Sequence, residues 1–157
     1  MISTNAMPNN LFLDLETFST TPIKSGTYRY CADCEIMLLA YALDDAPVAC
    51  WDLAAGETMP DDLAEVLLDE SITITAHNSM FDRTALRLAG NSMPLLRQAA
   101  ENIPRWRDTL VQALAHSLPG GLDKVCEIFN LSEEESKQKD GKALVKFTDD
   151  ARKLLEG

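Results

Sequence analysis

Hydrophobic and polar residues alternate near the start of the chain. Residues 11–16 read Leu-Phe-Leu-Asp-Leu-Glu, which is typical of a strand with one buried face. We expect a loop over 17–33, a second strand over 36–43 and a third over 48–51, with turn-forming residues at 44–47 between the last two. This order predicts that the first three strands are antiparallel.

From residue 60 onward the pattern indicates alternating helices and strands. Such an alternation predicts an α/β fold in which helices flank a five-stranded mixed sheet. Residues 1–10 are polar and are expected to be a disordered N-terminus, while 11–157 are expected to form one domain. The expected elements are a helix from residue 60, a strand over 72–75, a helix over 78–89 stopped by Gly90, a strand over 106–109, a helix ending near His116 and a helix over 122–129.

The composition narrows the possible functions. Acidic residues outnumber basic ones 25 to 14, for a net charge of −11, so the chain is not expected to bind nucleic acid by bulk attraction. Cations held by carboxylates would reverse the local charge, so nucleic-acid chemistry here is expected to require metal. There is no signal-peptide pattern and no apolar run of the ~20 residues that cross a bilayer, which predicts a cytoplasmic protein without a membrane partner.

Cys31 and Cys34 have the spacing of a metal or redox pair. Cys50 and Cys126 do not form a second pair of this kind, so a complete zinc site is not expected. We expect ordinary reduced thiols.

Asp14 and Glu16 are the first candidate functional residues. Because residues two apart in a strand point to the same face, both carboxylates project together, opposite the apolar Leu13 and Leu15. They require a cation, a hydrogen-bond network or exposure at a strand end. Oxygen ligands of this kind suit Mg²⁺ or Mn²⁺. On this pattern alone, a metal site and a solvated strand end both remain open.

Asn78–Asp82 forms the second candidate, at the expected start of a helix. Asn78 is suited to cap the helix, Phe81 to anchor it in the core, and Asp82 to lie one turn inside it. A cap with an acid near the positive helix end explains these residues locally. Their combination with Asp14 and Glu16 on an earlier strand indicates more than a local role.

The two segments together resemble the DEDD superfamily of 3′–5′ exonucleases, which have a ribonuclease-H-like fold. Phe12–Thr17 resembles the first exonuclease motif and Asn78–Asp82 the second. Four further segments resemble the exonuclease part of phage-type family A DNA polymerases, so the likeness covers roughly residues 11–147. These segments are 26–30, 40–44, 118–123 and 139–145.

The resemblance implies two-metal hydrolysis of single-stranded DNA 3′ ends with Mg²⁺ or Mn²⁺, beside a polymerase module on the same full-length chain. It implies that Asp14 bridges both ions, that Glu16 binds the ion carrying the attacking water, and that Asp82 supports the second ion. The residues it places against the substrate are Thr17, His77, Asn78 and Phe81. A loop histidine at 77 and a core position for Phe81 remain open as alternatives.

The third exonuclease motif is missing from the chain. The family has Tyr-x-x-x-Asp, or a His followed by Asp five residues on, whereas position 151 is Ala and His116 is followed at that offset by Gly121. We therefore expect the domain to be truncated before its last metal-binding carboxylate. Two alternatives stay open: a non-catalytic remnant that binds nucleic acid or a partner, and a free-standing DEDD exoribonuclease.

Overall fold

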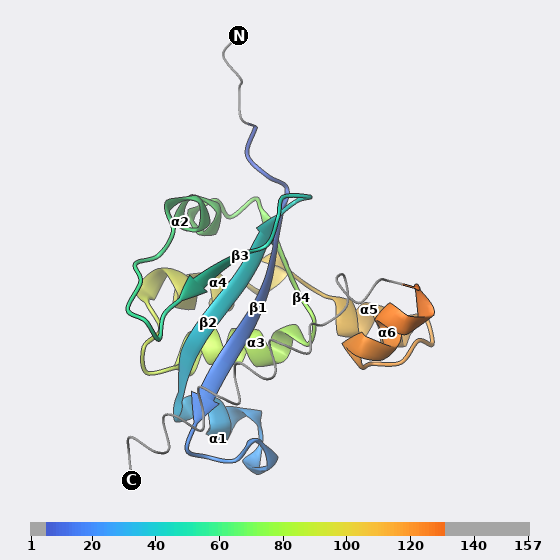
Figure 1. Cartoon of the computed structure of the whole chain (residues 1–157), viewed down its shortest axis with the longest axis horizontal. Coiled ribbons are helices and arrows are strands. Elements are labelled where there is room, and N and C mark those ends of the chain that lie inside the picture. Colours follow the sequence, from blue (N-terminus) through green and yellow to red (C-terminus); the bar gives the residue numbers. More distant parts are fainter. Residues whose placement is uncertain (1–5, 131–157) are drawn as a thin grey trace. The chain divides into compact units, whose positions relative to one another are not determined.

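The computed structural model describes residues 6–130, which belong to two compact units divided after Thr109. The first unit holds the sheet and most of the helices, and the described part of the second holds the last two helices (Figure 1). None of the helices in the described part combines the length and the apolar character that a membrane crossing requires. The strands are β1 (Asn10–Ser19), β2 (Cys34–Leu43), β3 (Ala49–Asp52), β4 (Thr73–Ala76) and β5 (Trp106–Asp108).

The five strands form one mixed sheet in the order β3-β2-β1-β4-β5. β1 and β2, and β2 and β3, are antiparallel, while β4 runs parallel to both β1 and β5. The prediction of a five-stranded mixed sheet with three antiparallel first strands is therefore confirmed.

Three helices of the first unit lie on one face of the sheet. In Figure 1, α2, α3 and α4 lie behind the sheet, and α1 lies at the end where β1 finishes. The helices are α1 (Thr27–Ala32), α2 (Asp61–Leu68), α3 (Ser79–Leu88), α4 (Pro94–Glu101), α5 (Thr109–Ala115) and α6 (Leu122–Ile128), with the 3-10 turns η1 (Ile23–Ser25) and η2 (Ile103–Arg105).

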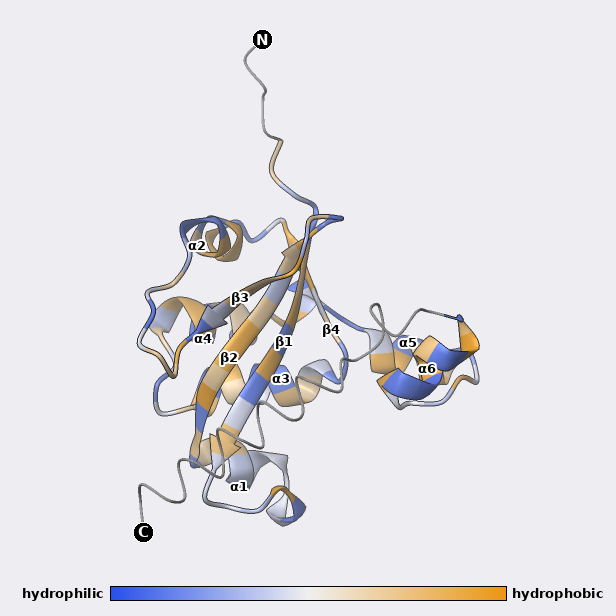
Figure 2. Ribbon diagram, viewed as in Figure 1, coloured by the Kyte–Doolittle hydropathy of each residue, from blue (hydrophilic) through white to orange (hydrophobic). Residues whose placement is uncertain are grey.

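The core of the first unit lies between the sheet and α2, α3 and α4. On β1, Leu11, Leu13 and Leu15 are buried, as the alternating pattern predicts. α2 and α4 bury residues spaced three and four apart, which is the apolar stripe of a surface helix. In Figure 2, hydrophilic residues interrupt the otherwise largely hydrophobic ribbon of β1.

Two predicted features of this unit are wrong. The loop expected over 17–33 contains the end of β1, η1 and α1, because Tyr30 and Cys31 pack inward and give a short helix tertiary support. Gly90 does not end α3 through a left-handed conformation, since positive φ among described glycines occurs at other positions. α3 ends at Leu88, and the N–H of Gly90 donates to the carbonyl of Cys34 at 3.0 Å.

The N-terminal boundary is also shifted. β1 begins at Asn10, and the carbonyl of Asn9 accepts a hydrogen bond from the N–H of Thr73 at 3.0 Å. The Asp44 carboxylate accepts from the N–H groups of both Asn9 and Asn10. Asn9 and Asn10 are therefore part of the fold, whereas the prediction placed them in the disordered N-terminus.

The second unit is described from Leu110 to Asn130. Cys126 is buried within it, whereas Phe129, expected on the same apolar stripe of α6, is 62% exposed. The sequence after Asn130, including the lysine-rich segment of the resemblance, lies outside the described residues.

Arg105 is a buried cation that joins three parts of the first unit. Its guanidinium donates hydrogen bonds to the carbonyls of Val66, Leu67 and Ile72. It therefore supplies donors to carbonyl groups at the end of α2 and just before β4. Its side chain is only 6% exposed, and burial lowers its pKa. The arrangement stabilises the fold mainly through these hydrogen bonds to backbone carbonyls.

Replacing Arg105 by Ala is expected to lower the free energy of unfolding by about 3–5 kcal/mol, because three buried carbonyls lose their donor. Urea denaturation followed by circular dichroism measures this difference. Arg97→Ala on the exposed side of α4 is the matched control and should change the value by less than about 0.5 kcal/mol. Equal effects of the two changes would contradict the role of Arg105.

Candidate active site

Asp14 and Glu16 lie on the central strand of the sheet. β1 is paired with β2 on one side and with β4 on the other. The pairing with β4 ends at Phe12, opposite Thr75. Beyond that point β4 no longer pairs with β1, and in this part of β1 Asp14 is exposed and Glu16 is half-buried.

A β-bulge marks the position of Glu16. The pairing of β1 with β2 shifts between Glu16 and Thr17, which face Leu38 and Ile36, so that Met37 is the extra residue. A bulge bends a strand and changes the direction of its side chains, and bulges are frequent beside active sites. The extra residue lies on β2, so β2 is the strand that bends, directly opposite Glu16 and Thr17 of β1.

Asp82 lies beside β1 beyond the end of its pairing with β4. It is in the first turn of α3, its side chain is 3% exposed, and its carboxylate accepts a hydrogen bond from the backbone N–H of Leu15. That N–H lies between Asp14 and Glu16 in the sequence. The structure thus brings the second predicted motif into direct contact with the first.

The pKa of Asp82 is affected by its burial and by neighbouring acids. Burial and, after it, the negative charge of Asp14 raise the pKa of Asp82 to about 8, with a smaller contribution from Asp108. The hydrogen bond from Leu15 acts in the opposite direction. Two carboxylates that destabilise each other's charge in a partly buried place are suited to share a cation.

Asp108 holds the start of α3 from the neighbouring strand. Its carboxylate accepts hydrogen bonds from the N–H groups of Asn78 and Ser79, both at 2.9 Å, and from the Ser79 hydroxyl at 3.0 Å. These are the N–H groups that a helix leaves unsatisfied at its N-terminus. Asp108, at the end of β5, therefore fixes the turn that carries Asp82.

The predicted capping role of Asn78 is wrong. Asn78 occupies the N-cap position in a left-handed conformation, with φ 65°, and its side chain makes no capping hydrogen bond. Asn adopts this conformation more readily than most residues. Because Asp108 supplies the cap, the side chain of Asn78 is not used for that purpose.

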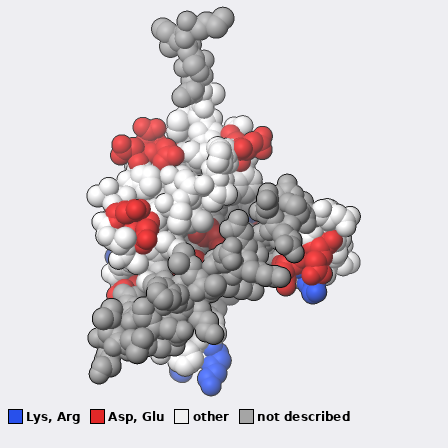
Figure 3. Space-filling model, viewed as in Figure 1, with Lys and Arg blue, Asp and Glu red and all other residues white. Residues whose placement is uncertain are grey.

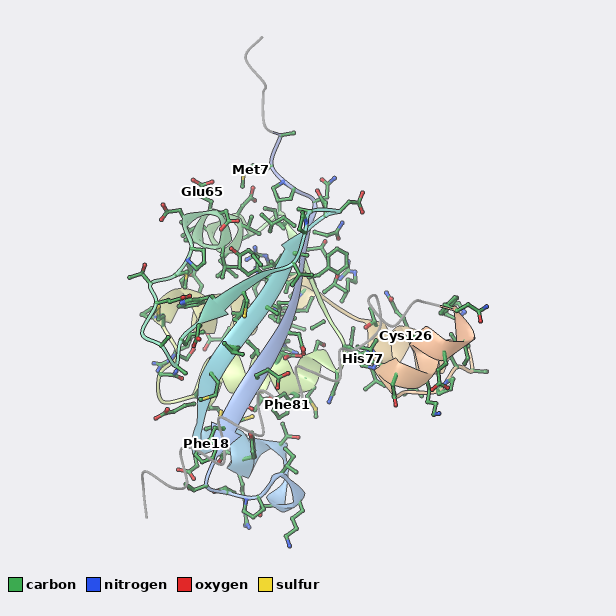
Figure 4. The ribbon with its side chains drawn as sticks, in the orientation of Figure 1. Met7, Phe18, Glu65, His77, Phe81 and Cys126 are labelled. Atoms are coloured by element: carbon green, nitrogen blue, oxygen red, sulfur yellow. The ribbon has the colours of Figure 1, made fainter. Side chains whose placement is uncertain are left out.

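His77 lies in the connection from β4 to α3, as Figure 4 shows. Its Nδ1 lies 2.9 Å from the hydroxyl of Thr109, which in turn donates to the carbonyl of Ala76 at 3.4 Å. Either His77 Nδ1 or the Thr109 hydroxyl can be the donor of the bond between them, depending on the tautomer of the ring. The ring is thereby oriented beside the start of the second motif.

Thr17 and Phe81 meet on Tyr30 of α1. The hydroxyls of Thr17 and Tyr30 lie 3.0 Å apart, and the Tyr30 hydroxyl also approaches the Thr17 carbonyl at 3.2 Å. The rings of Tyr30 and Phe81 are tilted, with centroids 5.9 Å apart. Both residues thus pack against α1, and Phe81 packs against the hydrophobic core.

The three predicted metal ligands do not form a complete cluster. Within residues 6–130, no group of three His, Cys, Asp or Glu side chains converges closely enough to hold a metal ion. Asp14 and Asp82 influence each other electrostatically, and Glu16 follows Asp14 by two residues on β1. The described part of the chain therefore provides a pair of acids with a third on the same strand.

Cys31 and Cys34 are both free and buried, and their side chains are hydrogen-bonded to each other. Burial raises the pKa of Cys34 to about 12. A thiol that resists ionisation is a poor nucleophile and a poor metal ligand. That Cys31 and Cys34 are ordinary reduced thiols stays a prediction.

No protein-family model matches the chain. It is 41% identical over 140 residues to the DNA polymerase of Bacillus phage SP02, a match that covers 87% of this chain and 20% of the polymerase. The chain thus spans about a fifth of the length of this relative.

Two solved structures of Brucella melitensis NrnC are similar in fold. The first matches with a TM-score of 0.57 at 20% identity, covering 87% of this chain and 59% of the NrnC chain. The second, with bound Mg²⁺, has a TM-score of 0.57 at 19% identity and covers 94% of this chain and 68% of the NrnC chain. The chain is therefore homologous over most of its length to a part of a phage DNA polymerase, and its ribonuclease-H-like fold is similar to that of the NrnC structures.

Proposed function

We propose that this domain removes nucleotides from the 3′ end of single-stranded DNA, as the proofreading exonuclease of a phage-like DNA polymerase. The observation that carries the proposal is the contact between the two motifs, in which buried Asp82 lies against the strand of Asp14 and Glu16. The relative extends far beyond the matched 140 residues, which leaves room for a polymerase module on the same full-length chain.

The acids suit a divalent cation, Mg²⁺ or Mn²⁺. The buried carboxylate of Asp82 and the nearby charge of Asp14 are oxygen donors whose repulsion a cation would relieve. Two bound cations would supply a hydroxide nucleophile and neutralise charge on the leaving 3′ oxygen. Asp14, Glu16 and Asp82 would hold these cations, with Asp14 shared between them, Glu16 on the side of the attacking water and Asp82 on the side of the leaving oxygen.

The remaining residues of the site hold these acids in place. Asp108 fixes the first turn of α3, and the N–H of Leu15 holds the Asp82 carboxylate beside β1. His77 and Asn78 flank this turn and are the proposed substrate contacts. Thr17 and Phe81 are engaged with Tyr30, so we propose that they shape the site from its α1 side.

A binding module without catalytic activity is the second candidate. The observation that favours it is that residues 6–130 provide no three-ligand cluster. Under the exonuclease proposal the missing ligand comes from a third motif, Tyr-x-x-x-Asp, in a longer polymerase chain. Under the alternative the pair of acids binds nucleic acid or a partner without cleavage.

Metal binding tests the proposed site. Millimolar Mn²⁺ or Mg²⁺ is expected to raise the melting temperature of the 157-residue chain by mass action, and Asp14→Ala should abolish this increase. Differential scanning fluorimetry, with Asp61→Ala on exposed α2 as a control, measures the difference. An increase in the Asp14 variant equal to that of the parent would rule out the assigned ligands.

A further inference from the structure

η1 and α1 are attached to both halves of the candidate site. Tyr30 of α1 binds Thr17, which follows Glu16 on β1 where the pairing with β2 shifts. The same ring packs against Phe81, which directly precedes Asp82 on α3. The segment that contains η1 and α1 is therefore held at the edge of the site from two independent directions.

The outer side of this segment carries exposed apolar and cationic side chains. Tyr28 is 63% exposed and Ile23 is 57% exposed, although both are large hydrophobic residues. Lys24 and Arg29 are also exposed and lie in the last turns of η1 and α1. We call these four residues, Ile23, Lys24, Tyr28 and Arg29, the α1 surface.

The charge of the α1 surface differs from that of the whole chain. The chain carries a net charge of −11, yet the largest group of cationic atoms visible on the first unit in Figure 3 lies at the end that carries η1 and α1. Within the described residues, neither Lys24 nor Arg29 forms an ion pair, since the ion pair found there joins Lys124 and Glu127. Their charges are not neutralised by neighbouring carboxylates of that part.

We propose that the α1 surface binds the single-stranded nucleic acid whose 3′ end enters the site, an inference that rests on the proposed function. Lys24 and Arg29 contact phosphates of the strand, and Tyr28 stacks on an unpaired base beside Ile23. Aromatic stacking of this kind accepts any base, and cations beside it follow the backbone. A strongly acidic protein thereby binds a polyanion through one local surface and its metal site.

The test is binding of a fluorescent oligothymidine of about ten nucleotides to the 157-residue chain, followed by anisotropy in millimolar Mn²⁺ over a range of salt concentrations. Arg29→Glu is expected to weaken binding by about 5–20-fold and to reduce the slope of log affinity against log salt by about 0.7, the value for one phosphate on a single strand. Tyr28→Ala should weaken binding by about 5–100-fold without changing that slope.

Arg97→Glu on exposed α4 is the matched control, because it makes the same change of charge on another helix and should alter affinity less than about twofold. Circular dichroism verifies that each variant is folded. If the parent protein binds the oligonucleotide, and the Arg29→Glu and Tyr28→Ala variants bind it no more weakly than Arg97→Glu, then the proposed role of the α1 surface is wrong. That outcome leaves the exonuclease proposal standing. If the parent protein does not bind the oligonucleotide, both the role of the α1 surface and the exonuclease proposal are wrong.

Discussion

Asp82→Asn is expected to stabilise the metal-free domain near pH 8. The pKa of Asp82 is raised to about 8 by burial and by Asp14, so the folded protein holds a proton that the unfolded chain releases near the ordinary carboxyl value of 3.8. The stability that this proton provides is fully present below that ordinary value and is lost as the pH rises through about 8. Asn cannot ionise, so the variant does not lose stability as the pH rises.

The expected gain is about 5 kcal/mol at and above pH 8 in EDTA and close to zero near pH 4. Each tenfold difference in proton affinity between the folded and unfolded states is worth about 1.4 kcal/mol, and the loss of a helix-end charge offsets up to about 1 kcal/mol. Urea denaturation at both pH values gives the difference. Asp61→Asn, an exposed acid in the first turn of α2, is the matched control and should show neither effect. A variant at position 82 that is less stable than the parent at both pH values would contradict the electrostatic account.

The 157-residue chain is expected to degrade single-stranded DNA at least about a thousandfold more slowly than a longer chain that includes the next Tyr-x-x-x-Asp. Hydrolysis requires both cations to be held to within a fraction of an ångström, and displacement by about 1 Å costs roughly 100-fold in rate. Under the proposed function, a third motif would add a carboxylate ligand and a tyrosine, and a site without them is expected to lose far more rate than one ligand's share of the binding energy.

Single-turnover digestion in millimolar Mn²⁺ compares the two chains at equal concentration, on DNA and on RNA of the same sequence. Asp82→Ala in the longer chain should remove the regained activity. Rapid digestion by the 157-residue chain would instead show that the fourth ligand lies within it, and Asp108, Asp149 and Asp150 would be the positions to replace.

Local sequence patterns predict the parts of this fold that depend on neighbouring residues. β1 is recognisable because Leu13 and Leu15 alternate with the acids Asp14 and Glu16, and α2 because three apolar residues repeat at helical spacing. α4 is not among the predicted elements, although Pro94 at its first turn and the buried Leu96, Ala99 and Ala100 form a usable signal.

Features that depend on distant contacts could not be predicted. α1 has six residues and persists because Tyr30 reaches Thr17 and Phe81. The cap of α3 comes from Asp108, which follows Asn78 by 30 residues, so the local pattern favours Asn78 instead. The same holds for the site. The sequence pattern indicates its acids, but the distances between them depend on how β1 and α3 pack together.

The central claim is that Asp14, Glu16 and Asp82 belong to one hydrolytic site that acts from the 3′ end. The most direct measurement is electrophoresis of a 5′-labelled single-stranded oligonucleotide incubated with the longer polymerase chain in Mg²⁺, alongside its Asp14→Ala, Asp82→Ala and Asp61→Ala variants. We predict a ladder that shortens one nucleotide at a time with the parent and Asp61→Ala, and intact substrate with Asp14→Ala and Asp82→Ala. Unchanged ladders in the Asp14 and Asp82 variants, or release of the labelled 5′ nucleotide as the first product, would contradict this account.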